Sequence, residues 1–152
     1  MSLENREFLQ EVMRKEIRDR KIPISLGKTC PVQCTFCYEM DHSYRHTFDM
    51  PLTTQEDWVF ILNEIIAFPT RATESWVLGG NEYMEWTDLA LHPKAMEWIE
   101  EFLEKTDKNI IMFSVGYFDP KKINRLAEKY PGRINFELSV ITMGAYRKQL
   151  MP

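Results

Sequence analysis

The chain has 152 residues, enough for one ordinary domain and short for two, and its 44% hydrophobic content with nine Phe, six Tyr and four Trp argues against disorder. A net charge of -4 gives no basic footprint for phosphate, so a nucleic-acid partner is not expected. No apolar run is long enough to cross a bilayer and the first ten residues lack the apolar core of a signal peptide, which favours a cytoplasmic protein without membrane contact.

The first expected element is an amphipathic helix within residues 1–21, where apolar residues recur at near-helical spacing among charges of both signs. Residues 22–152 are expected to form the remaining domain. It begins with a short strand in which Ile24 and Leu26 alternate with Ser25. This strand leads directly into a segment that contains all the cysteines of the chain.

The next helix is the most clearly marked in the chain. Thr53, three residues before Glu56, predicts a capping box at its start. Its expected buried face consists of Trp58, Ile61, Leu62, Ile65 and Ile66. An apolar burst over residues 74–78 then predicts a second strand, which closes in a glycine turn.

Strand and helix continue to alternate to the end of the chain. A helix is expected over residues 92–106 with Pro93 in its first turn, and a buried strand over 109–116. Asp119 and Pro120 predict the cap and first position of another helix, and residues 132–140 a fourth strand. The alternation predicts an α/β fold, a partial (β/α) barrel of about four parallel strands.

The fourth strand has two different faces. Alternation groups Ile134, Phe136, Leu138 and Val140 on a face expected to meet the helices. The polar residues Asn135, Glu137 and Ser139 fall on the other face, which would line the lumen of a barrel-like sheet.

Three closely spaced thiols carry the main chemical signal. Cys30, Cys34 and Cys37 follow the spacing C-x3-C-x2-C, and an odd set of this kind without an export signal favours a metal over disulfides. Two alternatives follow from the donors. A tetrahedral zinc site would take His42 or His46 as its fourth ligand, whereas a [4Fe–4S] cluster held by three thiolates would leave one iron open.

The run from Cys30 to Cys37, CPVQCTFC, follows the first strand of a β/α array and resembles the signature of the radical S-adenosylmethionine (radical SAM) enzymes, including Phe36 before the last cysteine. The resemblance implies that the three cysteines hold a [4Fe–4S] cluster whose open iron binds S-adenosylmethionine. It also implies reductive cleavage of that cofactor to a 5′-deoxyadenosyl radical, which abstracts hydrogen from a substrate. An electron donor such as ferredoxin or flavodoxin is the implied partner.

A second match lies after the second strand, where the family commonly has a glycine-glycine-glutamate turn that contacts the methionine ammonium. Gly79 and Gly80 match this turn, Asn81 occupies the usual acidic position and Glu82 follows. Asn81 can accept a hydrogen bond but brings no negative charge. Whether Asn81 or Glu82 contacts the cofactor is left open, and a plain strand-ending turn that needs glycine is the structural alternative.

Weaker correspondences lie on the third and fourth strands. Ser114 stands where relatives often have a polar residue at a strand end, and Glu137 and Ser139 where relatives place polar groups near the ribose or methionine. The resemblance implies cofactor contacts for all three, whereas the residues by themselves indicate ordinary strand positions. The substrate, and with it the choice among oxidoreductase, lyase and transferase, stays open.

The resemblance covers about Ile22 to the end, but the family core usually has six β/α units and only four strands are expected here. The edge at residues 134–140 would then be uncovered, which predicts either a missing C-terminal segment or self-association. The alternative to a radical enzyme is a truncated or degenerate metal-binding domain, with iron-sulfur or zinc, that catalyses nothing. The absent strands and Asn81 are the observations that favour this alternative.

Overall fold

The structure is a computed structural model that describes residues 3–25, 51–69, 74–79, 92–114 and 119–138. Within these ranges the helices are α1 (Leu3–Arg18), α3 (Gln55–Ala67), α4 (Ala95–Lys105) and α5 (Pro120–Lys129). The strands are β1 (Lys21–Ile22), β2 (Ser75–Leu78), β3 (Asn109–Ser114) and β4 (Ile134–Leu138). All neighbouring strands are parallel and the sheet order is β1-β2-β3-β4, so the expected α/β fold with four parallel strands is confirmed.

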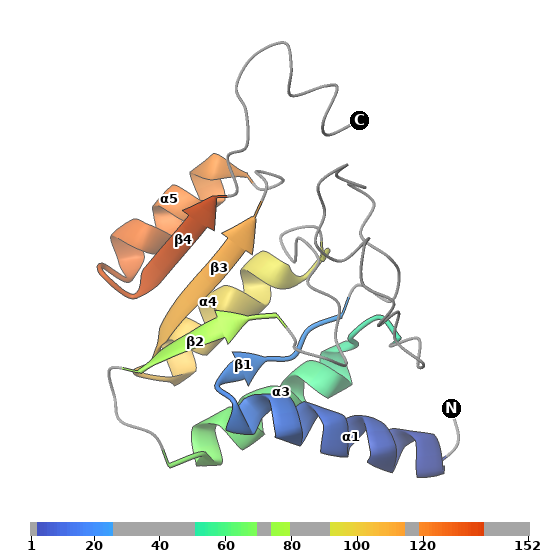
Figure 1. Ribbon diagram of the computed structural model, residues 1–152. Helices are drawn as coiled ribbons and strands as arrows, with labels where there is room; N and C mark the ends of the chain where they lie inside the picture. Colours follow the sequence, from blue (N-terminus) through green and yellow to red (C-terminus); the bar gives the residue numbers. More distant parts are fainter. Residues whose placement is uncertain (1–2, 26–50, 70–73, 80–91, 115–118, 139–152) are drawn as a thin grey trace.

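The described helices pack on one face of this sheet. Buried side chains from α1, α3, α4 and α5, such as Met13, Ile65, Phe102 and Leu126, join Trp76 and its neighbours on the sheet in one hydrophobic core. Figure 1 shows α4 behind β2 and β3, with α1 and α3 together at the β1 end of the sheet. A sequential strand order with helices on one face is the arrangement of β/α barrels. In doubly wound sheets the order of the strands reverses part-way across the sheet, and helices cover both faces.

The described helices follow one another across the sheet in the order of the chain. Arg14 of α1 lies 3.4 Å from Glu64 of α3, and Trp58 of α3 stacks on Trp98 of α4.

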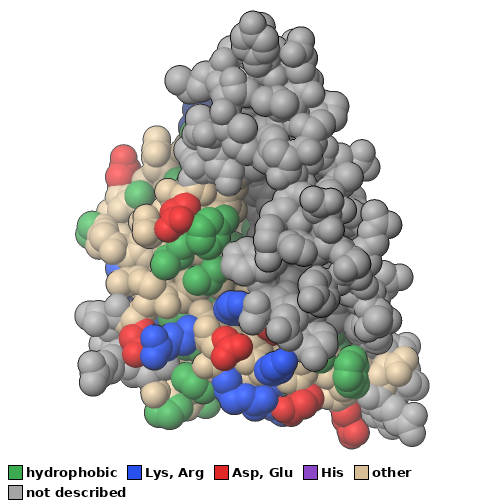
Figure 2. All heavy atoms as spheres, in the orientation of Figure 1, with side chains coloured by type: hydrophobic (Ala, Val, Ile, Leu, Met, Phe, Trp, Pro, Cys, Tyr) green, Lys and Arg blue, Asp and Glu red, His purple; other side chains and the backbone are tan. Residues whose placement is uncertain are grey.

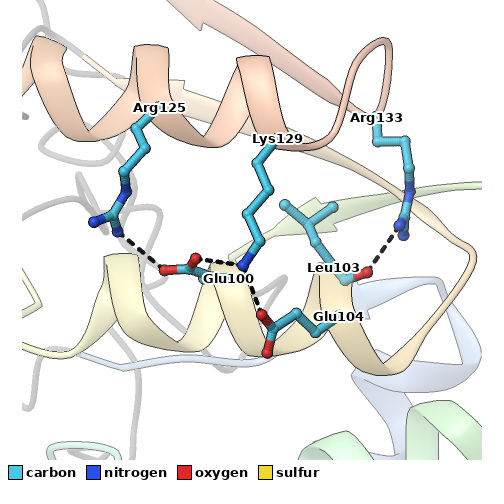
Figure 3. Close-up of polar contacts among 6 residues, drawn as sticks. All are labelled: Glu100, Leu103, Glu104, Arg125, Lys129 and Arg133. Carbon is cyan, nitrogen blue, oxygen red and sulfur yellow. Dashed lines mark hydrogen bonds and ion pairs between the residues drawn. The ribbon is translucent and has the colours of Figure 1, made fainter.

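Ion pairs join α4 to α5. Glu100 of α4 binds both Arg125 and Lys129 of α5, and Lys129 also lies 2.7 Å from Glu104 of α4 (Figure 3). These carboxylates raise the pKa of Lys129, Glu104 most strongly. Exposed ion pairs contribute little stability, so the apolar core holds the helices and these pairs align them.

Arg133, in the turn before β4, binds the end of α4. Its guanidinium donates to the backbone carbonyls of Leu103 at 2.8 Å and Thr106 at 2.9 Å, as Figure 3 shows for Leu103. The last carbonyls of a helix have no partners within the helix, and a cationic donor satisfies them. Arg133 therefore joins the α4 end to the start of the edge strand.

Several expected boundaries need correction. The capping box of α3 uses Thr54 and Asp57 rather than Thr53 and Glu56, because the Thr53 hydroxyl is taken up by a partner described below. Ile66, expected on the buried face, is 48% exposed. The first strand is at Lys21–Ile22, earlier than Ile24 and Leu26 suggested.

The start of α4 is also later than expected. Pro93 lies in a turn before the helix, and Lys94 takes the cap position. Its backbone N–H donates to the ring of His92, which is part of the network described below. The turn is therefore organised by a histidine that the sequence pattern had placed inside the helix.

Other expectations are confirmed. Asp119 caps α5 by accepting from the Lys121 backbone N–H at 3.0 Å, and Pro120 is the first helical residue. On β4, Ile134 packs against the core, as does Phe136, while Asn135 and Glu137 are exposed. None of the helices in the described ranges has the length and apolar character needed to span a membrane.

Candidate cofactor-binding edge of the sheet

The carboxyl ends of the four parallel strands lie at one edge of the sheet. The described residues there are Ser25 beyond β1, Gly79 beyond β2, Ser114 at the end of β3 and Leu138 at the end of β4. Parallel β/α sheets bind their ligands at this edge. The segments 26–50 and 80–91, which contain most of the expected site residues, are joined to the sheet here through Ser25 and Gly79.

Gly79 is the expected site residue with the most distinctive backbone. It is buried and has a φ of 131°, in a region that L side chains rarely adopt. Its N–H donates to the carbonyl of Ile22 at 3.1 Å, which continues the hydrogen bonding between β1 and β2. Glycine is therefore required where β2 leaves the sheet, in agreement with a glycine turn after the second strand.

Ser114 and Glu137 lie on neighbouring strands but on opposite faces of the sheet. Glu137 pairs with Phe113 and is exposed, whereas Ser114 pairs with Leu138 and is 4% exposed. Alternation places Ser114 on the same face as Met112, toward the helices. The structure thus brings these two residues to the same edge without bringing their side chains together.

The face opposite the helices is partly apolar. Among its residues, by alternation along the strands, are Val77, Ile111, Phe113, Asn135 and Glu137. Phe113 is 39% exposed and pairs with Glu137. Figure 2 shows hydrophobic side chains beside an acidic one over the β3–β4 region of this view.

The remaining expected site residues lie outside the described ranges: Cys30, Cys34, Cys37, Phe36, Gly80, Asn81, Glu82 and Ser139. The same holds for His42 and His46. Within the described part of the chain, no group of three or more His, Cys, Asp or Glu side chains could hold a metal ion. The three thiols remain the candidate donor set, on a segment that starts one residue after Ser25.

The two ends of the cysteine-bearing segment are tied together. The Ser25 N–H donates to the Thr53 hydroxyl at 2.7 Å, and the Thr53 N–H donates to the Ser25 carbonyl at 3.0 Å. Each residue is only 4% exposed. The chain therefore leaves the sheet at Ser25 and returns beside it at Thr53, which fixes where both ends of this segment lie.

His92 joins this contact from a third segment. Its Nε2 lies 3.3 Å from the Thr53 carbonyl, and its Nδ1 accepts from the Lys94 backbone N–H at 3.1 Å. Because Nδ1 is an acceptor, the neutral ring carries its proton on Nε2 and donates it to Thr53. Burial lowers the pKa of His92, an effect that the hydrogen bond to Thr53 only partly opposes.

Sequence reasoning did not find His92. The residues that usually cap helices are Ser, Thr, Asp and Asn, and a histidine before proline gives no comparable signal. A polar residue immediately before a Pro that shortly precedes a helix was the available hint, but its partner Thr53 lies 39 residues earlier in the chain.

Comparison with known proteins identifies no relative. No family model, curated protein or solved structure matches this chain.

Proposed function

We propose that this chain is the cluster-bearing part of a radical SAM enzyme, in which Cys30, Cys34 and Cys37 hold a [4Fe–4S] cluster and S-adenosylmethionine binds the iron that they leave open. One observation carries the proposal. The C-x3-C-x2-C motif begins five residues beyond the last described residue after β1, Ser25, at the carboxyl edge of a parallel β/α sheet with sequential strand order. That edge is where such sheets bind ligands.

The donor set fits the cofactor. Thiolates are soft ligands that suit iron-sulfur clusters, and three of them satisfy three of four irons. When bound and reduced by an external donor such as ferredoxin or flavodoxin, the cluster supplies the electron that splits S-adenosylmethionine into methionine and a 5′-deoxyadenosyl radical, which takes a hydrogen atom from the substrate.

The protein's own residues bind and orient the cofactors. Gly79 directs the chain from β2 into the segment with Gly80, Asn81 and Glu82, where an amide or carboxylate oxygen accepts hydrogen bonds from the methionine ammonium. Phe36 is assigned to the cluster surroundings.

The strand-end residues have unequal support. Glu137, exposed on the face opposite the helices, is assigned with Ser139 to the polar groups of the cofactor. Ser114 has weaker support for direct contact because it is buried toward the helices.

The competing function is a non-catalytic metal-binding domain, favoured by Asn81 in place of an acidic residue. Such a domain would hold either an iron-sulfur cluster on the same cysteines or zinc on the cysteines together with His42 or His46. The zinc form differs from the proposed enzyme in the metal and the ligands, whereas the iron-sulfur form differs from it in giving no response to S-adenosylmethionine.

The test is anaerobic reconstitution of the purified chain with iron and sulfide, and separately with zinc, followed by metal and sulfide analysis. The proposal predicts about four iron and four sulfide per chain. Single Ala substitutions of Cys30, Cys34 and Cys37 should each lower this content, whereas His42→Ala and His46→Ala, the matched controls, should retain it. Stoichiometric zinc uptake that depends on a histidine would favour the competing function.

A further inference from the structure

The contact between Ser25 and Thr53 closes a long segment at its base. Residues 26–52 lie between two residues that exchange two hydrogen bonds, at 2.7 and 3.0 Å, in a buried site. Ordering the ends of a segment of this length costs conformational entropy, which such buried contacts offset. Of these two hydrogen bonds, the one between the Ser25 N–H and the Thr53 hydroxyl uses a side chain, so it is the one that substitution can remove.

His92 links this base to the segment that follows Gly79. Residues 80–91 begin after Gly79 and end at His92, whose ring bridges the Thr53 carbonyl and the Lys94 N–H. The ring also lies against Trp98 of α4, with ring centroids 4.5 Å apart. The imidazole therefore has two hydrogen-bonding arms and one packed face, and its position is set by α4.

Because the site is buried, the loss of either hydrogen-bonding arm of His92, the bond at Nε2 or the bond at Nδ1, should reduce stability. Ser25, Thr53 and His92 are all 4% exposed, so removing one partner takes away a hydrogen bond at a buried site, where it is costly to lose. The Nε2 arm joins two segments that are distant in sequence, whereas the Nδ1 arm is local and organises the start of α4. The two arms can be separated by substitution, since the amide nitrogen of Gln reaches the Nε2 position and the shorter Asn reaches only the Nδ1 position.

We propose that Thr53 and His92 form a latch, made by the hydrogen bonds of Thr53 to Ser25 and His92, that positions the cysteine-bearing segment relative to the segment after Gly79. The cluster and S-adenosylmethionine are thereby held in the correct position relative to each other. The latch itself is a property of the folded chain, and its role in cofactor binding rests on the proposed function. Thr53 and His92 are positioning residues, which act through the segments they join.

The variants isolate each arm. Thr53→Val removes the hydroxyl at nearly constant shape, and Thr53→Ser restores it. His92→Asn removes the arm to Thr53, and His92→Gln retains it. Thr54→Ala is the matched control, because it removes the neighbouring helix cap of α3 while leaving the latch residues in place.

The first readout is amide hydrogen exchange of Ser25 in the metal-free protein, measured by NMR. We expect Ser25 to exchange about tenfold faster in Thr53→Val and about threefold faster in His92→Asn, as the net worth of one hydrogen bond implies. Thr53→Ser, His92→Gln and Thr54→Ala should stay near the wild type. Unchanged exchange of Ser25 in Thr53→Val and His92→Asn would overturn the latch.

The second readout is the S-adenosylmethionine concentration that produces half of the maximal change in the EPR spectrum of the reconstituted, reduced protein. The positioning role predicts an increase of about tenfold in Thr53→Val and His92→Asn, with rescue in Thr53→Ser and His92→Gln. An equal response in all variants, with faster Ser25 exchange, would make the latch purely structural and leave the proposed function intact. If the wild type takes up no cluster, the proposed function fails and the positioning role with it, while the exchange measurement still decides the latch.

Discussion

Trp58 of α3 and Trp98 of α4 stack with ring centroids 5.2 Å apart and an interplanar angle of 8°, and each indole N–H bonds to the other's helix. Trp58 donates to Glu101 of α4 at 2.6 Å, and Trp98 donates to Gln55 of α3 at 3.0 Å. Both rings are almost fully buried. This reciprocal pair fixes α3 against α4, and these helices begin next to Thr53 and His92.

Replacing one indole should therefore destabilise the protein even when an aromatic ring is kept. Trp58→Phe removes the hydrogen bond to Glu101 and leaves a smaller ring, so we expect a loss of about 1–3 kcal/mol in the free energy of unfolding. Urea unfolding followed by circular dichroism gives this value. A double-mutant cycle with Trp98→Phe should show a coupling of about 0.5–1.5 kcal/mol, and strict additivity would mean that the two indoles are coupled no more strongly than the Phe rings that replace them.

The pH dependence of stability should reveal His92. Burial lowers its pKa below the ordinary 6.5, so the unfolded chain binds the proton more tightly than the folded one. The stability that comes from the neutral ring is complete above pH 6.5 and is lost as the pH falls through the lower folded value.

The measurement is the urea midpoint of the wild type and of His92→Gln between pH 5 and 8. The wild type should lose more stability than His92→Gln on acidification, since Gln keeps the Thr53 arm without a titrating group. Parallel curves for the two proteins would contradict the assignment of a depressed pKa to His92.

Thr53 and Thr54 should respond differently to loss of the hydroxyl. Thr54→Ala removes the capping box with Asp57 at an exposed site and should cost about 1 kcal/mol. Thr53→Val removes a hydrogen bond to the buried Ser25 N–H and should cost more, about 1–3 kcal/mol. Equal losses in the free energy of unfolding, measured with urea under identical conditions, would show that the buried hydrogen bond contributes no more than the exposed cap.

Gly79 and Gly132 form a second matched pair. Gly132 has a φ of 74° with open space around its Cβ position, near the left-handed helical region that other residues can enter, so Gly132→Ala should cost about 1 kcal/mol. Gly79, with a φ of 131°, lies far outside that region, and Gly79→Ala should cost up to about 3 kcal/mol. Thermal unfolding of both variants tests the order, and a milder effect at Gly79 would contradict the required turn.

The sequence alone predicted those parts of the fold in which local signals and burial agree. Asp119 with Pro120 predicted the start of α5, and the alternation of Ile134, Phe136, Asn135 and Glu137 predicted the two faces of β4, because each signal depends on neighbours within a few residues. The parallel sheet followed from the alternation of strands and helices.

The sequence alone did not predict the role of a residue when a partner far away in the chain determines that role. Thr53 and Thr54 both carry a cap signature, and only the buried Ser25 N–H, 28 residues from Thr53 in the chain, assigns the hydroxyl of Thr53 elsewhere. His92 acquires its role from Thr53 in the same way. At the candidate site, alternation places Ser114 and Glu137 on opposite faces only once the register between β3 and β4 is known.

If the three cysteines hold a cluster with one iron open to S-adenosylmethionine, that molecule must change the electronic environment of the cluster. EPR spectroscopy of the anaerobically reconstituted, dithionite-reduced chain, with and without S-adenosylmethionine, measures this change. We expect a [4Fe–4S] signal whose spectrum changes when S-adenosylmethionine is added, and loss of that signal in Cys34→Ala. A reconstituted cluster whose spectrum is identical with and without saturating S-adenosylmethionine would contradict this expectation.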